Sequence, residues 1–212
     1  MKTKPLFIIA LFFTALFNSS FASELQKKGG GNAFEQGTIA ISAGYGFPNW
    51  VSLAFKTYDS YTGYKASGIG PAHLKFEYGV SDKIGIGLSL NYVQYKVSWP
   101  EYDPFGVGSS IYQEGYTGSS LSALVRMNLH FATSDKLDPY WGIGVGYRSY
   151  NFKYFNDNPF YVTDPLDEFK ALVPVGFETT IGMRYYFTNN IGAYLEMGMA
   201  KSLIQGGLAV KF

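Results

Sequence analysis

Apolar and polar residues alternate with a period of two over most of the chain after residue 37, which is the pattern of β-strands. One set of alternate positions carries large aliphatic and aromatic side chains, such as Ile84, Ile86 and Leu88. The other set carries Gly, Ser, Asn and a few charged residues. The alternation predicts eight strands, at 38–47, 71–78, 84–92, 121–131, 141–148, 173–187, 191–199 and 207–212.

The connections between these segments alternate between short and long. The short ones contain turn-forming Gly, Asn, Asp and Ser residues: 79–83, 132–138 and 188–190. A further connection, at 200–203, is also tight. Loops of about 20 residues are uncommon in compact soluble domains but usual on the external rim of outer-membrane barrels. The long connections, rich in Tyr, Gly, Asp and Pro, are predicted to be such loops: 48–70, 98–118 and 153–171.

The residues opposite the apolar face distinguish a soluble barrel from a membrane barrel. If the apolar face pointed inward, the water-exposed face would consist largely of Gly, Ser and Thr, which form and protect a sheet poorly. If it points outward to lipid, the glycines face a narrow interior and make room for long polar side chains. Because open sheet edges are not tolerated in lipid, the sheet must close. The pattern favours an all-β, eight-stranded antiparallel up-and-down transmembrane β-barrel, with both termini opposite the long loops.

Aromatic residues fall near the ends of the predicted strands, where membrane barrels carry interfacial girdles. On the side of the long loops these residues are Tyr45, Phe47, Tyr92 and Tyr147. On the side of the termini they are Tyr78, Phe131, Trp141, Tyr185, Phe187 and Phe212. The spacing between the two groups matches strands of about ten residues that cross a bilayer at a tilt.

The composition agrees with a surface that is not in water. Only 16% of the 212 residues are charged, against about 25% in ordinary soluble domains. Aromatic residues make up 18%, and there are 25 glycines. The absence of cysteine excludes disulfides and thiolate-bound metals. A formal net charge of +1 gives no reason to expect a nucleic-acid partner.

Residues 1–22 have the features of a secretory signal peptide. Lys2 and Lys4 precede an apolar run of twelve residues, and Ala22 closes a small-residue cleavage site. Such a run spans about 18 Å, too short for a bilayer core of about 30 Å. We therefore predict export to the outer membrane, a flexible leader at 23–36 and a barrel at 37–212.

The signal peptide, the eight alternating strands and the C-terminal residues together resemble small bacterial outer-membrane β-barrel proteins of the OmpA/OmpX-like family. In Gln205–Phe212 a polar residue is followed by Gly207, alternating apolar residues that include Val210, and a terminal aromatic residue. This pattern is similar to the family's insertion signal, and the resemblance implies that the barrel-assembly machinery recognises it. The family has no single function, so the resemblance leaves function open.

Eight charged residues occupy inward positions and form a candidate lumen charge network: Lys75, Glu77, Arg126, Arg148, Glu178, Arg184, Glu196 and Lys211. Unpaired charges in a narrow interior would cost several kcal/mol each, so we expect them to be paired. Arg148 and Glu178 lie on neighbouring predicted strands and are the pair that we expect first. The alternative is that these charges line a small selective pore.

No catalytic, cofactor or metal site is predicted. His73 and His130 are the only histidines, and no suitably spaced serine accompanies His73. The first hypothesis is a non-enzymatic envelope protein that stabilises the outer membrane or binds an unknown extracellular ligand through 48–70, 98–118 and 153–171. A narrow channel for small or apolar solutes is the second, and a lipid-modifying enzyme is the third. Membrane lipid and the assembly machinery are the other expected partners.

Overall fold

The structure is a computed structural model, and it describes residues 31–49, 63–102, 111–160, 168–170 and 174–212. The predicted signal peptide and residues 23–30 of the predicted leader lie outside the described residues, as do 50–62, 103–110 and 161–167 of the three predicted loops.

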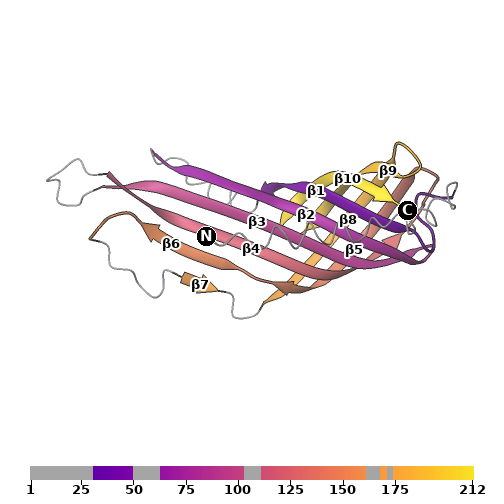
Figure 1. The fold of residues 1–212 in the computed structure, drawn as a ribbon, viewed down its shortest axis with the longest axis horizontal. Helices are drawn as coiled ribbons and strands as arrows, with labels where there is room; N and C mark the ends of the chain where they lie inside the picture. The colour runs from indigo at the N-terminus through magenta and orange to yellow at the C-terminus, as the bar shows by residue number, and fades with distance from the viewer. Residues whose placement is uncertain (1–30, 50–62, 103–110, 161–167, 171–173) are drawn as a thin grey trace, which may run out of the picture.

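Eight antiparallel strands form a closed barrel, in the order β1-β2-β3-β4-β5-β8-β9-β10 (Figure 1). The last strand pairs with the first, with Ile41 opposite Val210, so the sheet has no open edge in the barrel. The predicted fold class is confirmed. The barrel strands are β1 (Ile39–Asn49), β2 (Lys65–Ser81), β3 (Ile84–Tyr102), β4 (Ile111–His130), β5 (Leu137–Arg148), β8 (Val175–Tyr186), β9 (Ile191–Met199) and β10 (Ser202–Lys211).

Several strands extend well beyond their predicted ends. β3 and β4 remain paired as far as Tyr102 and Ile111, so the prediction of a loop at 98–118 is wrong for both of its flanks. Part of the predicted loop at 48–70 belongs to β2. In the predicted loop at 153–171, β6 (Asn151–Asn156) pairs with β4, and β7 (Glu168–Lys170) pairs with β6. These strands form an extracellular sheet, made of Lys65–Ile69, Val93–Tyr102, Ile111–Ser120, β6 and β7, that continues the barrel to the left in Figure 1.

The alternation of β3 changes parity between Tyr92 and Val93. Below this point, Leu88, Leu90 and Tyr92 are exposed on the outside of the barrel. Above it, the apolar side chains occupy the buried face, with Val93, Tyr95 and Val97 at most 6% exposed. The reversal is expected where lipid gives way to water, because an apolar face that points outward is stable only in lipid. A pattern that changes parity within one strand resembles a strand end, which is why the sequence predicted a strand at 84–92 only.

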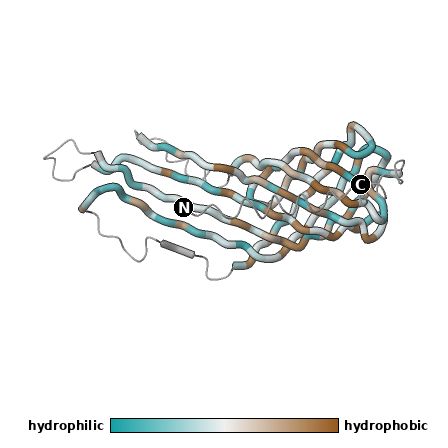
Figure 2. Tube along the Cα trace, viewed as in Figure 1, coloured by the Kyte–Doolittle hydropathy of each residue, from teal (hydrophilic) through white to brown (hydrophobic). Residues whose placement is uncertain are grey.

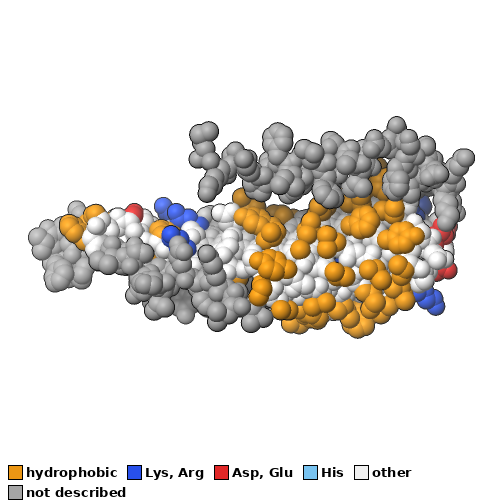
Figure 3. Space-filling model, turned by 60° about the horizontal axis from the view of Figure 1, so that its bottom comes forward, with side chains coloured by type: hydrophobic (Ala, Val, Ile, Leu, Met, Phe, Trp, Pro, Cys, Tyr) orange, Lys and Arg blue, Asp and Glu red, His pale blue; other side chains and the backbone are white. Residues whose placement is uncertain are grey.

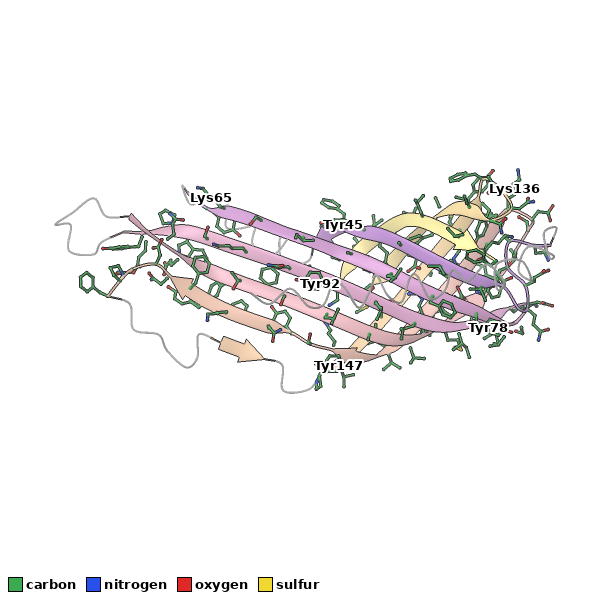
Figure 4. All side chains as sticks on the ribbon, viewed as in Figure 1. Tyr45, Lys65, Tyr78, Tyr92, Lys136 and Tyr147 are labelled. Atoms are coloured by element: carbon green, nitrogen blue, oxygen red, sulfur yellow. The ribbon has the colours of Figure 1, made fainter. Side chains whose placement is uncertain are left out.

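The barrel half of the molecule carries an apolar outer surface (Figure 3), and hydrophobic residues are more frequent along this half of the trace than along the extracellular sheet (Figure 2). Val125, Ile181 and Leu208 are each at least 60% exposed in this band. Tyr45, Tyr92 and Tyr147 lie at its extracellular border and Tyr78 lies toward the opposite end, as predicted for the girdles (Figure 4). Large side chains exposed in this way identify the surface as lipid-facing.

Within the described part of the chain, no helix is long and apolar enough to cross a membrane.

The end of the barrel that carries the short turns, the start of β1 and the C-terminal Phe212 is the periplasmic end. There, residues 32–36 pack against the barrel, which corrects the prediction of a flexible leader for this part of 23–36. Ala33 donates its N–H to the carbonyl of Ser134 at 2.7 Å, and Ala33 and Phe34 are at most 1% exposed. Phe212 and Ile39 exchange two backbone hydrogen bonds of 2.9 and 3.0 Å. Residues 32–36 and Phe212 thus both pack at the periplasmic end.

Candidate functional site

The periplasmic layer of the lumen is a ring of four charged groups. His130 Nδ1 lies 2.6 Å from Asp138 Oδ1, and His130 Nε2 lies 2.8 Å from Glu77 Oε1. Arg184 contacts the other oxygen of each carboxylate, with Nη1 3.1 Å from Asp138 Oδ2 and Nη2 against Glu77 Oε2. Because both imidazole nitrogens face carboxylate oxygens, both must donate, so His130 is an imidazolium in this arrangement. Two cations and two anions therefore balance in this layer.

A second layer is centred on Glu196, in the middle of the barrel. Lys75 Nζ lies 2.5 Å from Glu196 Oε2, and Arg126 Nη2 lies 3.2 Å from the same oxygen. Arg126 Nη1 also pairs with Glu178 Oε1 at 2.8 Å. Tyr140 donates its hydroxyl to Glu196 Oε1 at 2.7 Å, and its ring lies 4.5 Å from the guanidinium carbon of Arg184. Tyr140 thus connects the two layers, and this layer also contains two cations and two anions.

A third layer of neutral polar groups lies above the charges. Asn91 Nδ2 donates to Glu178 Oε2 at 3.3 Å, which turns the amide oxygen toward His73 Nδ1, 2.6 Å away. His73 Nδ1 is therefore the donor, and Nε2 is left as an acceptor 3.4 Å from Ser202 Oγ. Ser202 is 129 residues away in sequence, so sequence spacing could not associate it with His73.

Glycines of the inner face make room for these side chains. A Cβ atom at Gly144 would lie 2.8 Å from Cγ of Glu178, and one at Gly182 would lie 2.5 Å from Cγ of Glu196. Both distances are shorter than real Cβ contacts, so a larger residue would push the carboxylates out of their pairs. Small cavities remain between the described side chains of the lumen, and two of them each have room for about one water molecule.

The structure brings six of the eight predicted lumen residues into the two charged layers: Lys75, Glu77, Arg126, Glu178, Arg184 and Glu196. It does not contain the pair of Arg148 and Glu178. Glu178 pairs with Arg126, which is on the next strand but one and reaches across the inner face, and Arg148 Nε instead lies 3.4 Å from Ser120 Oγ. Sequence reasoning missed Asp138, because it falls at the end of a segment with a turn composition.

Lys211 lies at the rim of the barrel rather than in the charge network. Its Nζ donates to the carbonyl of Asn32 at 2.9 Å and lies 4.8 Å from the ring centroid of Tyr186. This contact exists because residues 32–36 pack against the periplasmic end, which the sequence did not predict. Lys211 therefore links residues 32–36 to the last strand.

The predicted insertion residues have distinct positions in the last strand. Gln205 is buried in the lumen, where its Nε2 donates to Glu196 Oε2 at 2.7 Å. Gly207 lies opposite Gly44, and Val210 lies opposite Ile41 and Ile191. Phe212 completes the pairing with β1.

The extracellular sheet carries an aromatic and acidic row on the face that continues the lumen. Glu114 accepts hydrogen bonds from Trp99 Nε1 at 2.6 Å and from the Tyr154 hydroxyl. Tyr116 stacks on Phe152 with ring centroids 4.6 Å apart. These groups come from β3, β4 and β6, so they tie the three strands together outside the membrane.

Comparison with known proteins finds likeness at the level of fold. No family model and no curated protein matches the sequence. Three solved structures are similar in fold. The first is the N-terminal β-barrel domain of Pseudomonas aeruginosa OprF, with 17% sequence identity, coverage of 84% of this chain and 98% of that chain, and a TM-score of 0.36. The second is Ail, the attachment invasion locus protein of Yersinia pestis, in complex with the heparin analogue sucrose octasulfate, with 14% identity, coverage of 84% and 99%, and a TM-score of 0.41. The third is the outer membrane protein OprG from Pseudomonas aeruginosa, with 14% identity, coverage of 84% and 97%, and a TM-score of 0.36.

At these identities and TM-scores the likeness gives no information about ligand or activity. The closed antiparallel barrel, its outward apolar band and its polar interior are themselves the structure of an outer-membrane β-barrel. The chain is therefore an outer-membrane barrel protein with the fold of the small eight-stranded barrels.

Proposed function

We propose that this protein is a non-enzymatic barrel with a closed lumen, which holds an extracellular sheet at the cell surface for binding. The observation that carries the proposal is the continuation of β2, β3 and β4 beyond the lipid band, where β6 pairs with β4 and the apolar face of β3 is reversed. A strand of about ten residues suffices to cross the membrane. β3 has 19 residues and β4 has 20, so nearly half of each strand is not needed to cross the membrane.

The packing of the lumen supports the closed state. The side chains of Arg126, Glu178, Arg184 and Glu196 are each at most 3% exposed and are held by ion pairs and hydrogen bonds across the barrel. Moving any of them aside would leave a buried charge without its partner, at a cost of several kcal/mol. Eight-stranded barrels are just wide enough for side chains to fill. These features favour a closed interior over a channel.

The arrangement at His73 gives little support to the alternative of a lipid-modifying enzyme. Ser202, His73 and Asn91 form a chain of hydrogen-bonding groups, which in an accessible cleft could activate a serine. All three residues are at most 3% exposed, and they face the lumen rather than the lipid. A membrane lipid has no route to them through the paired strands, so we assign them a structural role.

The last strand supports one further partner. Gln205, Gly207, Val210 and Phe212 fit the pattern expected for recognition by the barrel-assembly machinery, and we propose that they serve as the insertion signal. Lipid of the outer membrane contacts the apolar band, and the extracellular partner binds the extracellular sheet.

The experiment that tests the proposed function removes the two central strands of the extracellular sheet and leaves the barrel. Gln94 and Ser119 face each other in the pairing of β3 with β4, so an Asn-Gly turn can join them in place of 95–118. Cells that display the wild-type or the shortened protein are compared on surfaces coated with collagen, fibronectin, laminin or heparan sulfate. A mobility shift on heating checks that both barrels have folded.

We expect wild-type cells to bind at least one surface and cells with the shortened barrel to lose that binding. Equal binding by the two kinds of cells, or no binding by the wild type above that of cells without the protein, would contradict the proposal.

A further inference from the structure

Two cations meet at the extracellular mouth of the lumen without a carboxylate between them. Lys201 lies in the turn between β9 and β10 and is 6% exposed. Its Nζ donates to Ser120 Oγ at 2.5 Å, and Arg148 Nε donates to the same oxygen at 3.4 Å. Ser120 gives its own proton to the carbonyl of Ser149 at 2.7 Å. Two positive charges thus share one neutral oxygen.

The carboxylates of the lumen are already taken by other cations. Glu77 and Asp138 balance Arg184 and the imidazolium of His130. Glu178 and Glu196 balance Lys75 and Arg126. Among the residues that the structure describes, no acidic side chain lies within 4.0 Å of the charged nitrogens of Lys201 or Arg148, so no carboxylate of this part of the chain pairs with either cation.

Lys201 and Arg148 both line one of the small lumen cavities. Asn91, Ser122 and Glu178 contribute to its walls, and it has room for about one water-sized group. The two oxygens of Glu178 are directed to Arg126 and Asn91. The cavity is therefore polar, too small for a polyatomic ligand, and positive on the side of Lys201.

The titration of Lys201 agrees with an uncompensated charge. Burial, together with the charge of Arg148, lowers the pKa of Lys201 to about 7, and the carboxylate of Glu178 opposes this shift. A negative charge in the cavity would favour the ammonium form and raise the pKa again.

We propose that Lys201 and Arg148 bind a small inorganic monoanion, such as chloride, in this cavity. The anion supplies the counter-charge that the described residues do not provide at the mouth of the barrel. It joins the β9–β10 turn to β4 and β5, which meet at Ser120 and Arg148. Sulfate and phosphate are too large for the cavity, so recognition is by size as well as by charge.

The experiment uses the complete barrel folded in detergent. Its melting temperature is measured as sodium chloride or sodium bromide replaces sodium gluconate at constant ionic strength, since gluconate is too large to enter. The matched variants are Lys201→Met, which removes the buried charge and keeps most of the side-chain volume, and Lys136→Met, which removes an exposed charge in a periplasmic turn.

We expect chloride and bromide to raise the melting temperature of the wild type and of Lys136→Met, and to leave that of Lys201→Met unchanged. The same rise in Lys201→Met, or no rise in the wild type, would overturn the proposal. If Lys201→Met fails to fold, crystals of the wild type grown in bromide decide the question. An anomalous peak between Lys201 and Arg148 supports the site, and its absence refutes it.

Discussion

The ring of Phe34 lies flat on the imidazole of His130, with ring centroids 3.4 Å apart and planes inclined by 4°. Carboxylates bind both nitrogens of His130 and fix the orientation of its ring, and the phenyl ring of Phe34 covers one face of this charged group. The contact joins the segment before the first strand to the charge network of the lumen. Residues 32–36 thus cover the charge network at the periplasmic end of the barrel.

Replacing Phe34 by alanine should destabilise the barrel. The side chain is 1% exposed, and loss of a buried phenylalanine costs about 3–5 kcal/mol in well-packed sites. We expect a decrease toward the lower end of this range, because the site lies at a rim where water can enter. Equilibrium unfolding by urea in lipid vesicles measures it, with Lys83→Ala in an exposed turn as the control. Equal stability of Phe34→Ala and the control would show that the cover contributes nothing.

Glu196 holds the middle layer together, so Glu196→Ala should be among the most destabilising changes in the lumen. It leaves Lys75 and part of the charge of Arg126 buried without a counter-charge, which costs about 3–5 kcal/mol. Adding Lys75→Met to Glu196→Ala should recover part of that loss, since one unpaired cation is then removed. The same urea titration tests this. A double variant no more stable than the single one would argue against pairing as the cause.

The boundary between lipid and water lies at Tyr92, and single cysteines can locate it because the chain has none of its own. Spin labels are attached at Val125, Gln94 and Val93 in turn. Collisions with oxygen should dominate at Val125, and collisions with a water-soluble nickel chelate should dominate at Gln94. Val93 should be shielded from both, since it is 6% exposed. Oxygen-dominated relaxation at Gln94 would place the lipid boundary elsewhere.

Stability should rise with pH above neutrality when halide is absent. The pKa of Lys201 is about 7 in the folded protein, below the ordinary value of 10.5, so between these values the unfolded chain binds more protons than the folded one. Folding is therefore increasingly favoured as the pH rises through this window. Arg148 and Glu178 are the charged groups that line the same cavity as Lys201. In Lys201→Met the rise should be smaller by the contribution of this one group. An identical pH profile of the variant and the wild type is the contrary result.

Deletion of Phe212 separates assembly in the cell from intrinsic folding. The deletion removes two backbone hydrogen bonds with Ile39 at the end of the strand, so folding of the purified chain in detergent should be nearly unchanged. If Phe212 is part of the insertion signal, the heat-modifiable fraction in outer membranes should fall several-fold. Normal insertion of this variant in cells would show that Phe212 is not part of the insertion signal.

Alternation along the chain was sufficient to predict the barrel, because a two-residue period places each side chain inside or outside without any knowledge of distant contacts. Leu88 and Leu90 were thus assigned to lipid correctly. The extension of β3 beyond Tyr92 could not be predicted, because at Val93 the apolar residues change from the outward to the inward positions of the strand as the surrounding medium changes from lipid to water. The alternation tells which residues face outward only when the medium around the strand is known, because apolar residues face outward in lipid and inward in water.

The members of the charge network could be predicted, but their pairing could not. Lys75 and Glu196 are 121 residues apart and meet across the barrel, where strand tilt and side-chain length decide which groups touch. Arg148 was the predicted partner of Glu178 because the two lie on neighbouring strands. The pair is formed instead by Arg126, whose side chain extends across the inner face from the next strand but one. Phe34 was missed because a triple glycine and weak periodicity precede it, and its role depends on a ring stack that no local pattern encodes.

Ion conductance of the purified barrel in planar lipid bilayers tests the closed lumen most directly. With Arg126, Arg184, Glu178 and Glu196 paired across the interior, the account predicts a baseline without sustained single-channel steps. Brief, irregular events that also occur in bilayers without protein would agree with it. Regular steps of constant size that are altered in Glu196→Ala would show that the interior conducts, and would contradict the closed barrel on which the proposed function depends.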